Sequence, residues 1–528
     1  MPIPFKKVFL VVLDGFGLAE RGPGNAITEA GMPYLDELIA RYPAVSLAAA
    51  GLVVGLPWGQ PGNSEVGHSA IGTGRIVIQD LAHINTEIRS GVFFKNSTLI
   101  GAVDHAVKED SAVHFIGCTS PGGIHSHTDH LIALMELAHR RGARRVFVHF
   151  ITDGQDAPPQ DALNVLKNLE PYLKKFGARI ASVQGRSFAM DRVLNWKLTE
   201  RVWHAVVLGD APPISDVGAY LKEAYAGGKT DYSLEPATVV AEGVPIGAVQ
   251  DRDAVVFFDF RNDRVRQLAT PFVSTSTFSE FDPVRRPVGM YVATMTKYAE
   301  EFTVPIAYPA LDLANTAGEV VSKAGFGQWR IAEKEKEAHV TNFFNGGRIE
   351  AFPGERRAIV TSRQMTGSEY LAHPEMSAEK VVDAVLEHAG DDARLFVINF
   401  ANPDMIAHAG NLEATMKAMR VTDDCLKRLV EELRTQPDAA VVITADHGNA
   451  EELLDPLTGG EDTQHSTRNV PAVFVAADFE ERAPTGKNLE SLALEAPVGT
   501  LVDIAPTILY LLGIEKPAEM TGSRLVTV

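Results

Sequence analysis

Carboxylate and imidazole side chains follow three apolar segments of the chain, at the points where those segments end. They are Asp14 after residues 8–13, Asp404 and His408 after residues 395–400, and Asp446 and His447 after residues 440–444. Continuous apolar runs are typical of strands that are buried on both faces of a sheet. Ligands in open α/β sheets bind outside the carboxyl ends of strands. We therefore expect these side chains to meet at one edge of a sheet.

The spacing of two of these residues favours a metal site. Asp404 and His408 are four residues apart, and Pro403 suits the first position of a helix. A helix that begins there places both side chains on one face. His465 adds a further imidazole, and mixed Asp/His ligation suits Mn, Zn, Fe or Co better than Mg or Ca. Taken singly, an Asp-Gly pair is more often a turn and an Asp-x-x-x-His pair a solvated helix face. Their occurrence at successive strand ends favours metal binding.

Ser64 lies between a glycine-rich loop and an expected helix, in the segment Gly62-Asn63-Ser64-Glu65-Val66-Gly67-His68. A serine there can face an anion held by the amides of a helix N-terminus. Taken alone, it is more simply a helix N-cap. A Gly-x-Ser-x-Gly elbow is excluded because position 66 is valine. Beside a metal cluster the hydroxyl can become an alkoxide without a histidine base, so we interpret Ser64 as a nucleophile.

The composition limits the classes of function. The chain has 528 residues and a formal net charge of −19, which argues against nucleic-acid binding as its main role. Its two cysteines exclude a disulfide framework. Residues 1–7 lack the apolar core of a signal peptide, and no uncharged apolar run reaches the length of a membrane span. We expect a cytoplasmic protein with no nucleic-acid or membrane partner.

Strand-like and helical patterns alternate along the chain, which predicts an α/β fold with parallel sheets covered by helices. The expected strands are residues 8–13, 113–117, 146–151, 255–260, 290–294, 395–400, 440–444 and 472–475. Soft boundaries lie after residues 72–74 and within residues 298–311, a segment without clear periodicity. We expect a discontinuous metal-binding domain, residues 1–76 and 310–528, that is split by an inserted domain, residues 77–309.

The motifs around these residues resemble those of the cofactor-independent (2,3-bisphosphoglycerate-independent) phosphoglycerate mutases. The metal motifs alone indicate the alkaline-phosphatase superfamily, and the motifs of Ser64 and His125 narrow the resemblance to the mutases. The similar segments follow the family's order over essentially the whole chain. They are Leu13-Asp14-Gly15, residues 62–68, Gly122-Gly123-Ile124-His125-Ser126-His127, Pro374-Glu375-Met376-Ser377, Asn402-Pro403-Asp404-Met405 with His408, and residues 444–450.

This resemblance implies an alkaline-phosphatase-like parallel-sheet domain with an inserted second α/β domain. It also implies two Mn²⁺ ions, with another divalent metal as an alternative, and no bisphosphoglycerate cofactor. Ser64 would be transiently phosphorylated, and we expect the chain to act as a monomer. The implied ligands of one ion are Asp404, His408 and His465, and those of the other are Asp14, Ser64, Asp446 and His447.

The resemblance also implies a set of residues that hold a phosphoglycerate substrate. Arginine binds both carboxylate and phosphate bidentately, although a single arginine is more often a solvated surface charge. Gln155 departs from the family pattern, which usually has arginine at this position. A neutral amide can still form hydrogen bonds to the substrate, but it adds no positive charge to them. The implied residues are His125, Gln155, Asp156, Arg186, Arg192, Arg261, Arg264 and Lys336.

The expected activity is the interconversion of 3-phosphoglycerate and 2-phosphoglycerate in glycolysis and gluconeogenesis. Ser64 would take the phosphoryl group, Lys336 would offset its charge, and Asp156 would exchange protons with the glycerate hydroxyls. The alternatives are a metal-dependent phosphatase or sulfatase, another phosphomutase of the same superfamily, and a catalytically silent binding protein. The arginine-rich inserted domain argues against a simple hydrolase, which need not hold its product.

Overall fold

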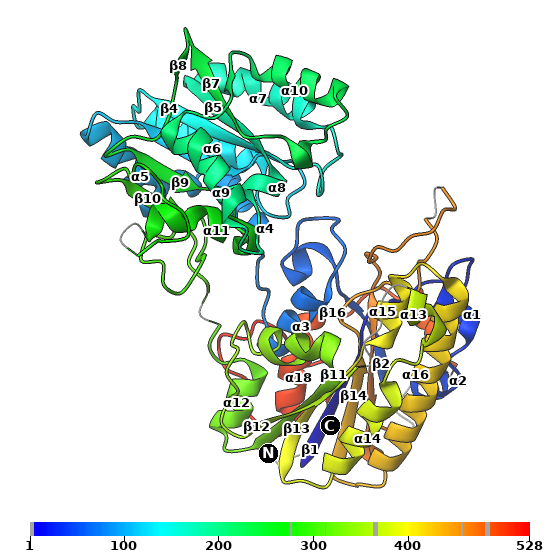
Figure 1. Ribbon diagram of the computed structural model, residues 1–528. Coiled ribbons are helices and arrows are strands. Elements are labelled where there is room, and N and C mark those ends of the chain that lie inside the picture. The colour runs from blue at the N-terminus through cyan, green and yellow to red at the C-terminus, as the bar shows by residue number, and fades with distance from the viewer. Residues whose placement is uncertain are drawn as a thin grey trace. The chain divides into compact units, whose positions relative to one another are not determined.

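The structure is a computed structural model that describes residues 5–274, 277–311, 313–362, 368–455, 458–480 and 486–527. Residues 1–4 of the N-terminal segment considered above lie outside the described residues. The chain forms two compact units, shown in Figure 1. Unit 1 is Met1–Gln79 with Asp312–Val528, and unit 2 is Asp80–Leu311. Unit 1 is therefore built from two separate stretches of chain, and the functional roles expected for the two domains stay predictions.

Unit 1 contains an eight-stranded sheet in the order β12-β11-β13-β1-β14-β15-β2-β16. Its central strand, β1, pairs in parallel with β13 on one side and with β14 on the other. The strands are β1 (Lys7–Leu13), β2 (Ala44–Ala48), β11 (Gly327–Glu333), β12 (Glu355–Val360), β13 (Ala393–Phe400), β14 (Ala439–Thr444), β15 (Val470–Val475) and β16 (Gly499–Thr500).

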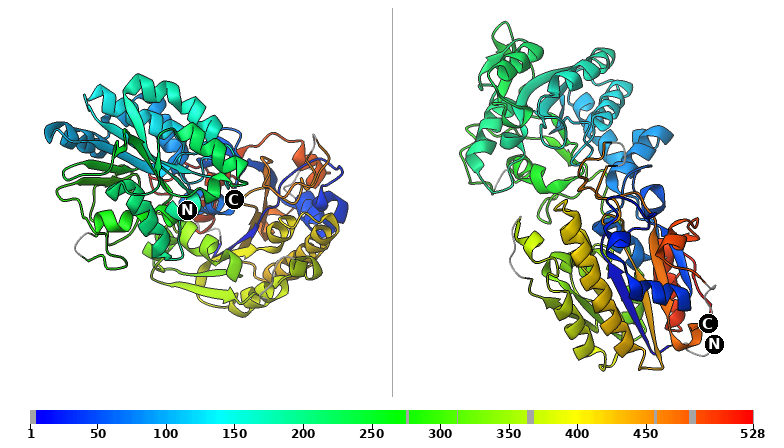
Figure 2. Two further views of the ribbon diagram at one scale, coloured as in Figure 1. Left: turned by 45° about the horizontal axis from the view of Figure 1, so that its top comes forward. Right: turned by 90° about the vertical axis from the view of Figure 1, so that its right-hand side faces the viewer.

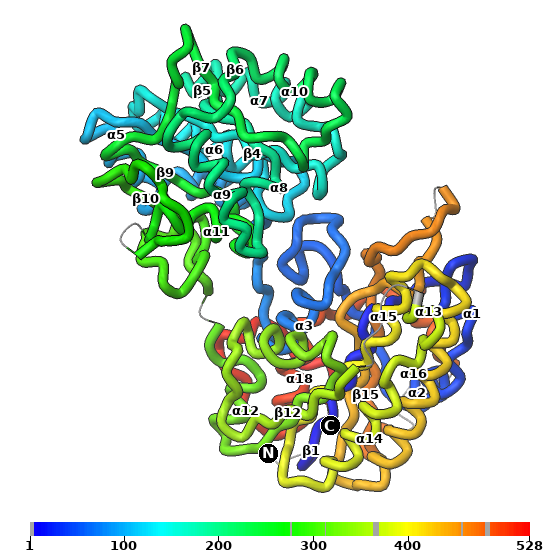
Figure 3. Tube along the Cα trace, in the orientation of Figure 1, coloured from blue at the N-terminus to red at the C-terminus, as the bar shows by residue number. Residues whose placement is uncertain are grey.

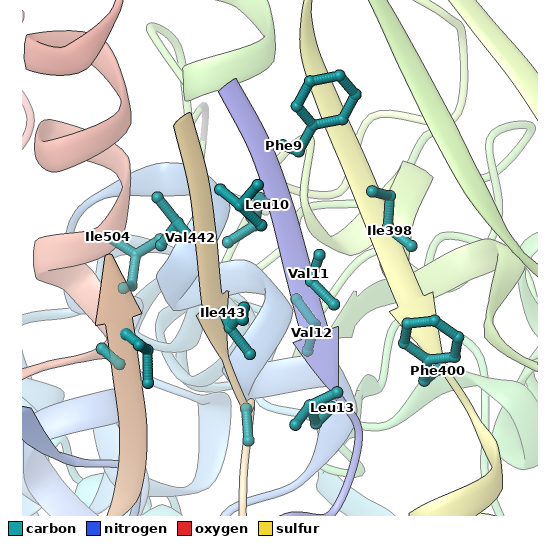
Figure 4. Close-up of a cluster of buried hydrophobic side chains, with 14 of the residues drawn as sticks. Phe9, Leu10, Val11, Val12, Leu13, Ile398, Phe400, Val442, Ile443 and Ile504 are labelled. Atoms are coloured by element: carbon teal, nitrogen blue, oxygen red, sulfur yellow. The ribbon is translucent and has the colours of Figure 1, made fainter. Parts of the chain in front are cut away.

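The three central strands end at the same edge of this sheet. Leu13 is in register with Phe400, and Val12 is in register with Thr444. The apolar side chains of β1, β13 and β14 alternate between the two faces of the sheet and are buried on both, and Figure 4 shows part of the cluster that they form. Burial on both faces explains the unbroken apolar runs in the sequence. The polar residues that follow these strands therefore begin at one common edge.

Two sets of helices pack against the sheet of unit 1. Helices α1, α2 and α14 each contact α16, and helices α3, α12 and α18 form a second set. Figure 2 shows the strands of unit 1 lying between helices. The helices are α1 (Ala26–Ala30), α2 (Pro33–Arg41), α3 (Ser64–Thr73), α12 (Ala317–Lys323), α13 (Ser368–Ala372), α14 (Ala378–His388), α15 (Asn402–Ala407), α16 (Leu412–Leu433), α17 (Leu489–Ala493) and α18 (Ile504–Leu511).

Unit 2 has its own sheet in the order β10-β9-β3-β4-β5-β7-β6, with β8 paired to β7. Figure 3 follows its chain from blue to green. The strands are β3 (Val113–Cys118), β4 (Val146–Thr152), β5 (Ala178–Gly185), β6 (Pro213–Ile214), β7 (Ala237–Ala241), β8 (Val244–Pro245), β9 (Ala254–Phe257) and β10 (Tyr291–Thr294). The helices are α4 (Asp80–Ser90), α5 (Ser97–Lys108), α6 (Thr128–Arg140), α7 (Ala162–Phe176), α8 (Arg186–Ala189), α9 (Trp196–Trp203), α10 (Val217–Ala226) and α11 (Asn262–Val273).

The α/β fold expected from the sequence is confirmed, but the sheets are not purely parallel. Strand β15 is antiparallel to both β14 and β2, and β7 is antiparallel to β5. A parallel connection needs a crossover, usually a helix. The described residues between β14 and β15 contain no helix, so the chain turns back and pairs in the antiparallel sense. No helix among the described residues is long and apolar enough to cross a membrane.

Candidate active site

One group of predicted metal ligands forms around helix α15, which begins at Asn402 with Pro403 in its first turn. Asp404 Oδ1 lies 3.3 Å from Nε2 of His408 and 3.3 Å from Nε2 of His465. The ligand atoms of these three residues all lie within 4.8 Å of one another. The four-residue spacing thus places Asp404 and His408 side by side. The fold adds His465 from a segment that is distant in sequence.

A second group is fully buried and consists of Asp14, Asp446 and His447, whose ligand atoms also lie within 4.8 Å of one another. Ser64 Oγ lies 3.0 Å from Asp14 Oδ1 and 3.0 Å from His447 Nε2. The rings of His447 and His465 stack with centroids 4.0 Å apart, so the two groups are neighbours. The structure therefore brings together all seven residues that the sequence singled out for metal binding.

Ser64 is the first residue of α3, but it is not the helix cap. Asn63 fills that role, because its side chain accepts a hydrogen bond from the backbone N–H of Val66 at 2.9 Å. The hydroxyl of Ser64 is thereby left for the site. A Cβ at Gly67 would lie 2.4 Å from the carbonyl oxygen of Asp446, so glycine is what allows α3 to approach the loop after β14.

Lys336 supplies a buried cation between the two groups. Its Nζ lies 2.6 Å from Asp14 Oδ1, 2.8 Å from Ser64 Oγ and 2.8 Å from Asp404 Oδ2. Burial disfavours the charge on Lys336, but the carboxylates of Asp14 and Asp404 outweigh burial and raise the pKa of Lys336 above its usual range. Burial alone would raise the pKa of Asp14 and Asp404. The charge of Lys336 opposes burial and helps to hold the pKa of both carboxyls below the usual range. The site therefore contains a permanent positive charge in contact with the Ser64 hydroxyl.

The donor atoms fit a divalent metal ion. Asp446 Oδ2 is buried and accepts no hydrogen bond of good geometry among the described residues, although His68 Nδ1 lies 3.0 Å away. A buried carboxylate oxygen in this situation is costly unless a cation balances it. The first group offers one carboxylate and two imidazoles, and the second offers two carboxylates and one imidazole. Both sets match the ligands of Mn²⁺ and similar metals. Burial lowers the pKa of His447, but the charges of Asp446, Asp14 and Asp404 outweigh it and raise this pKa to about 10.

Binding of Mn²⁺ to the buried group is expected to release a proton at about pH 8, because an imidazole binds a metal only when it is neutral. His447, with a pKa of about 10, is protonated at that pH when no metal is bound. The affinity for Mn²⁺ should therefore increase as the pH rises towards about 10 and decrease as the pH falls. Calorimetric titration in buffers with different ionisation enthalpies counts the protons released. An affinity independent of pH, with no proton release, would contradict this assignment.

Two buried residues that the sequence did not single out support the second group. Asn399 Nδ2 donates to Asp14 Oδ2 at 2.7 Å and also lies 3.1 Å from His68 Nε2. His68 Nδ1 lies 2.9 Å from the carbonyl oxygen of Ser64 and 3.0 Å from Asp446 Oδ2. A sequence signal exists for both: His68 follows Ser64 by one helical turn, and Asn399 is a polar residue inside an apolar strand.

In unit 2, Arg186 is buried at the end of β5 and is held by three side chains. It donates to Asp153 Oδ1 at 2.6 Å, pairs with Asp156, and donates to His125 Nε2 at 3.0 Å. Burial and the charge of Arg186 lower the pKa of His125 to about 4. His125 is therefore neutral at physiological pH, and its Nε2 is a hydrogen-bond acceptor.

The side chain of Asp263 lies near His125 and near two further predicted residues of unit 2. Its carboxylate lies 3.1 Å from Arg192 Nη1, 3.4 Å from Arg261 Nε and 3.5 Å from His125 Nδ1. Arg264 is half-buried and donates to the carbonyl oxygen of Met190 at 3.4 Å. The side chain of Gln155 is exposed, and only its backbone N–H contacts Asp153. The sequence did not indicate Asp153 or Asp263, although each lies within two residues of a predicted substrate-binding residue.

The largely parallel sheet of unit 1 and the two carboxylate–imidazole groups at its edge define a domain of the alkaline-phosphatase superfamily. Residues 360–514 match the sulfatase family model, and residues 84–300 match the model of the BPG-independent PGAM N-terminus. The chain is 43% identical to 2,3-bisphosphoglycerate-independent phosphoglycerate mutase of Moorella thermoacetica, over 99% of this chain and 98% of that protein. It is also 43% identical to the enzyme of that name from Pseudomonas aeruginosa, over 99% of both chains.

A phosphoglycerate mutase from Leishmania mexicana, whose crystal structures were determined at low cobalt concentration, has a similar structure. The TM-score is 0.68 at 30% sequence identity, and the likeness covers 99% of this chain and 98% of that chain. This chain belongs to the family of 2,3-bisphosphoglycerate-independent phosphoglycerate mutases. The family membership expected from the motifs is confirmed.

Proposed function

We propose that this chain interconverts 3-phosphoglycerate and 2-phosphoglycerate in glycolysis and gluconeogenesis, without a bisphosphoglycerate cofactor, through a phosphoserine at Ser64. The observation that carries the proposal is the surroundings of the Ser64 hydroxyl. Its Oγ lies 3.0 Å from both Asp14 and His447 and 2.8 Å from Lys336 Nζ. A nucleophile with carboxylate, imidazole and ammonium groups around it suits attack on a phosphoryl group.

The proposal includes two divalent ions, which we take to be Mn²⁺. Asp404, His408 and His465 would hold one, and Asp14, Ser64, Asp446 and His447 would hold the other. When bound, these ions lower the pKa of a coordinated hydroxyl and draw charge from phosphoryl oxygens. The cobalt named for the Leishmania mexicana structures supports a divalent ion here. The mixed carboxylate and imidazole donors favour Mn²⁺ over Mg²⁺.

The side chains of unit 1 perform the phosphoryl transfer in this proposal. Ser64 Oγ gives its proton to solvent before the attack and regains one when it is regenerated. It forms a bond to phosphorus while the bond from phosphorus to the glycerate oxygen breaks and that oxygen takes a proton from Asp156. Lys336, in contact with Ser64 Oγ, offsets charge on the transferring group. The reverse step, on the other glycerate hydroxyl, regenerates Ser64 and yields the isomer.

The side chains of unit 2 would hold the glycerate skeleton. Arg192, Arg261 and Arg264 offer cations for its carboxylate, and neutral His125 offers hydrogen bonds. Asp156 would exchange protons with the two glycerate hydroxyls, taking one from the hydroxyl that attacks and returning one to the hydroxyl that leaves. Arg186, buried against Asp153 and Asp156, orients this acid–base group.

Incubation of the protein with 3-phosphoglycerate and Mn²⁺, without bisphosphoglycerate, tests the proposal by phosphorus NMR. Formation of 2-phosphoglycerate is expected. Release of inorganic phosphate in its place would favour a phosphatase, and an unchanged substrate would favour a binding protein. The group of cationic side chains around Asp263 favours the mutase, because a phosphatase need not retain its dephosphorylated product.

We further propose that the chain acts as a cytoplasmic monomer whose partner is the small-molecule substrate. Both cysteines, Cys118 and Cys425, are buried and unpaired, as suits a reducing compartment. Size-exclusion chromatography with light scattering tests the oligomeric state. A stable dimer at micromolar concentration would contradict the monomer.

Gln155→Arg is expected to lower KM for 3-phosphoglycerate several-fold, with kcat changed less. A charged, bidentate partner contributes more than a neutral amide, on the order of 1 kcal/mol where it is partly desolvated. Arg186 does not fill this position, because its guanidinium is bound by Asp153, Asp156 and His125, and Gln155 itself is exposed. Steady-state kinetics at one ionic strength measures the effect.

Gln160→Arg is the matched control for this prediction. Gln160 is an exposed glutamine of the same segment, and its side chain donates to the carbonyl oxygen of Lys229. This variant adds the same charge to unit 2 and should leave KM unchanged. An equal decrease in both variants would mean that general charge, rather than a contact at position 155, is responsible. A raised KM in Gln155→Arg would show that a second cation is repelled there.

A further inference from the structure

Glu451 lies in the loop after β14, and its carboxylate is enclosed by three segments of unit 1. Its side chain is 3% exposed. Oε2 accepts the backbone N–H groups of Gly17 and Asn449, each at 2.9 Å. Oε1 accepts the hydroxyl of Ser466. One carboxylate thus joins the loop after β1, the loop after β14 and the segment before β15.

Each of the three segments contains a predicted metal ligand. Gly17 follows Asp14 by three residues, Asn449 follows His447 by two, and Ser466 directly follows His465. Asp14 and His447 belong to the buried group, whereas His465 belongs to the group around α15. The contacts of Glu451 therefore connect both groups of predicted ligands, although Glu451 is a ligand in neither.

The surrounding backbone is closely fitted to this carboxylate. A Cβ at Gly17 would lie 2.3 Å from the carboxyl carbon of Glu451, and a Cβ at Gly448 would lie 2.3 Å from its Oε1. Ser466 also donates its backbone N–H to the carbonyl oxygen of Gly448 at 3.0 Å, which closes the loop around the side chain. Any larger residue at position 17 or 448 would push the loops apart.

Burying this carboxylate is costly, because no salt bridge among the described residues involves Glu451. Burial raises the pKa of Glu451. An apolar side chain of similar size would fill the space without the desolvation penalty. Unlike an apolar side chain, the carboxylate makes three hydrogen bonds that join three separate segments. Groups that orient metal ligands in this way typically change metal affinity 10- to 100-fold when they are removed.

We propose that Glu451 is a positioning residue that shapes both metal sites. It holds three segments in place relative to one another: the segment with Asp14, the segment with Asp446 and His447, and the segment with His465. This inference rests on the metal sites of the proposed function. It does not depend on the identity of the substrate. It extends the site to a residue that contacts neither the predicted metal ions nor the phosphoryl group.

Direct titration of the metal-free protein with Mn²⁺, followed by calorimetry, tests the proposal. Glu451→Leu should bind Mn²⁺ about 10- to 100-fold more weakly than the wild type, and both sites should be affected. Glu451→Gln should stay within about 3-fold of the wild type. Its amide oxygen can accept the N–H groups of Gly17 and Asn449, and its NH₂ can donate to Ser466 Oγ. The substitution thus keeps the three contacts and removes only the charge.

Asp423→Leu is the matched control. Asp423 is a buried carboxylate of the same unit, and it accepts the backbone N–H groups of Tyr34 and Leu35 at 2.9 and 3.0 Å. These contacts lie at the start of α2, away from the predicted ligands. Loss of this carboxylate should lower the melting temperature of the metal-free protein and leave the affinity for Mn²⁺ unchanged. A general loss of stability is thereby separated from a loss of ligand positioning.

The inference is overturned if Glu451→Leu binds Mn²⁺ as tightly as the wild type, or if Asp423→Leu weakens binding equally. Should Glu451→Leu not fold, Ser466→Ala removes one contact of the same carboxylate and should weaken Mn²⁺ binding about 3- to 10-fold. An unchanged affinity in Ser466→Ala would then overturn it. A wild-type chain that binds Mn²⁺ but does not isomerise phosphoglycerate would refute the proposed function. The Mn²⁺ titration would still test the role of Glu451 in that case.

Discussion

Ser64→Ala is expected to lower mutase activity by at least about 10⁴-fold while the fold stays intact, because removal of a nucleophile eliminates the covalent route. The helix that begins at Ser64 should still form, since Asn63 caps it. Steady-state kinetics in saturating Mn²⁺ measures the loss, and the melting temperature reports the fold. Retention of more than about a hundredth of the activity would contradict the role of Ser64.

Labelling distinguishes a nucleophile from a residue that only supports the site. Brief incubation with phosphoglycerate labelled in the phosphoryl group should label the wild type and leave Ser64→Ala unlabelled. Ser69→Ala is the matched control, because Ser69 is also a buried serine of α3. It should be labelled like the wild type. Equal labelling of Ser64→Ala and the wild type would mean that another side chain takes the phosphoryl group.

Lys336→Met is expected to lower kcat about 10²- to 10³-fold, the usual effect of removing one group that stabilises developing negative charge in a water-excluded site. Lys336 Nζ is the only ammonium among the described residues that contacts Ser64 Oγ. Methionine keeps the length and apolar character of the side chain but removes its charge. The loss should therefore appear in transfer of the phosphoryl group rather than in folding.

The affinity for Mn²⁺ separates this role from metal binding. Lys336 contacts Asp14 and Asp404, so the variant removes a cation that competes for these carboxylates. Mn²⁺ should bind Lys336→Met at least as tightly as the wild type while kcat falls. Lys334→Met, at an exposed lysine two residues away, should leave both quantities unchanged. A variant that loses Mn²⁺ binding and recovers its kcat at high Mn²⁺ would indicate that Lys336 only supports the metal site.

The α/β class, the family and the grouping of Asp14, Asp404 and Asp446 could be predicted from the residues alone. These features depend on local order. An apolar run buried on both faces forms a strand, and parallel strands that lie side by side end at one edge. Residues directly after such strands must then be neighbours. The spacing of Asp404 and His408 within one helix works over a similarly short range.

Other features become visible only in the folded chain, because they join residues that are far apart in the sequence. Lys336 reaches Ser64 across 272 positions, and His465 reaches the carbonyl oxygen of Gly62 across 403. Strand β15 pairs with β14 in the antiparallel sense because the described residues between these two strands contain no helix that could carry the chain back for parallel pairing. Glu451 directly follows the motif of residues 444–450, yet its role depends on which loops close around it. Local patterns contain no information on such partners, since packing of the whole unit selects them.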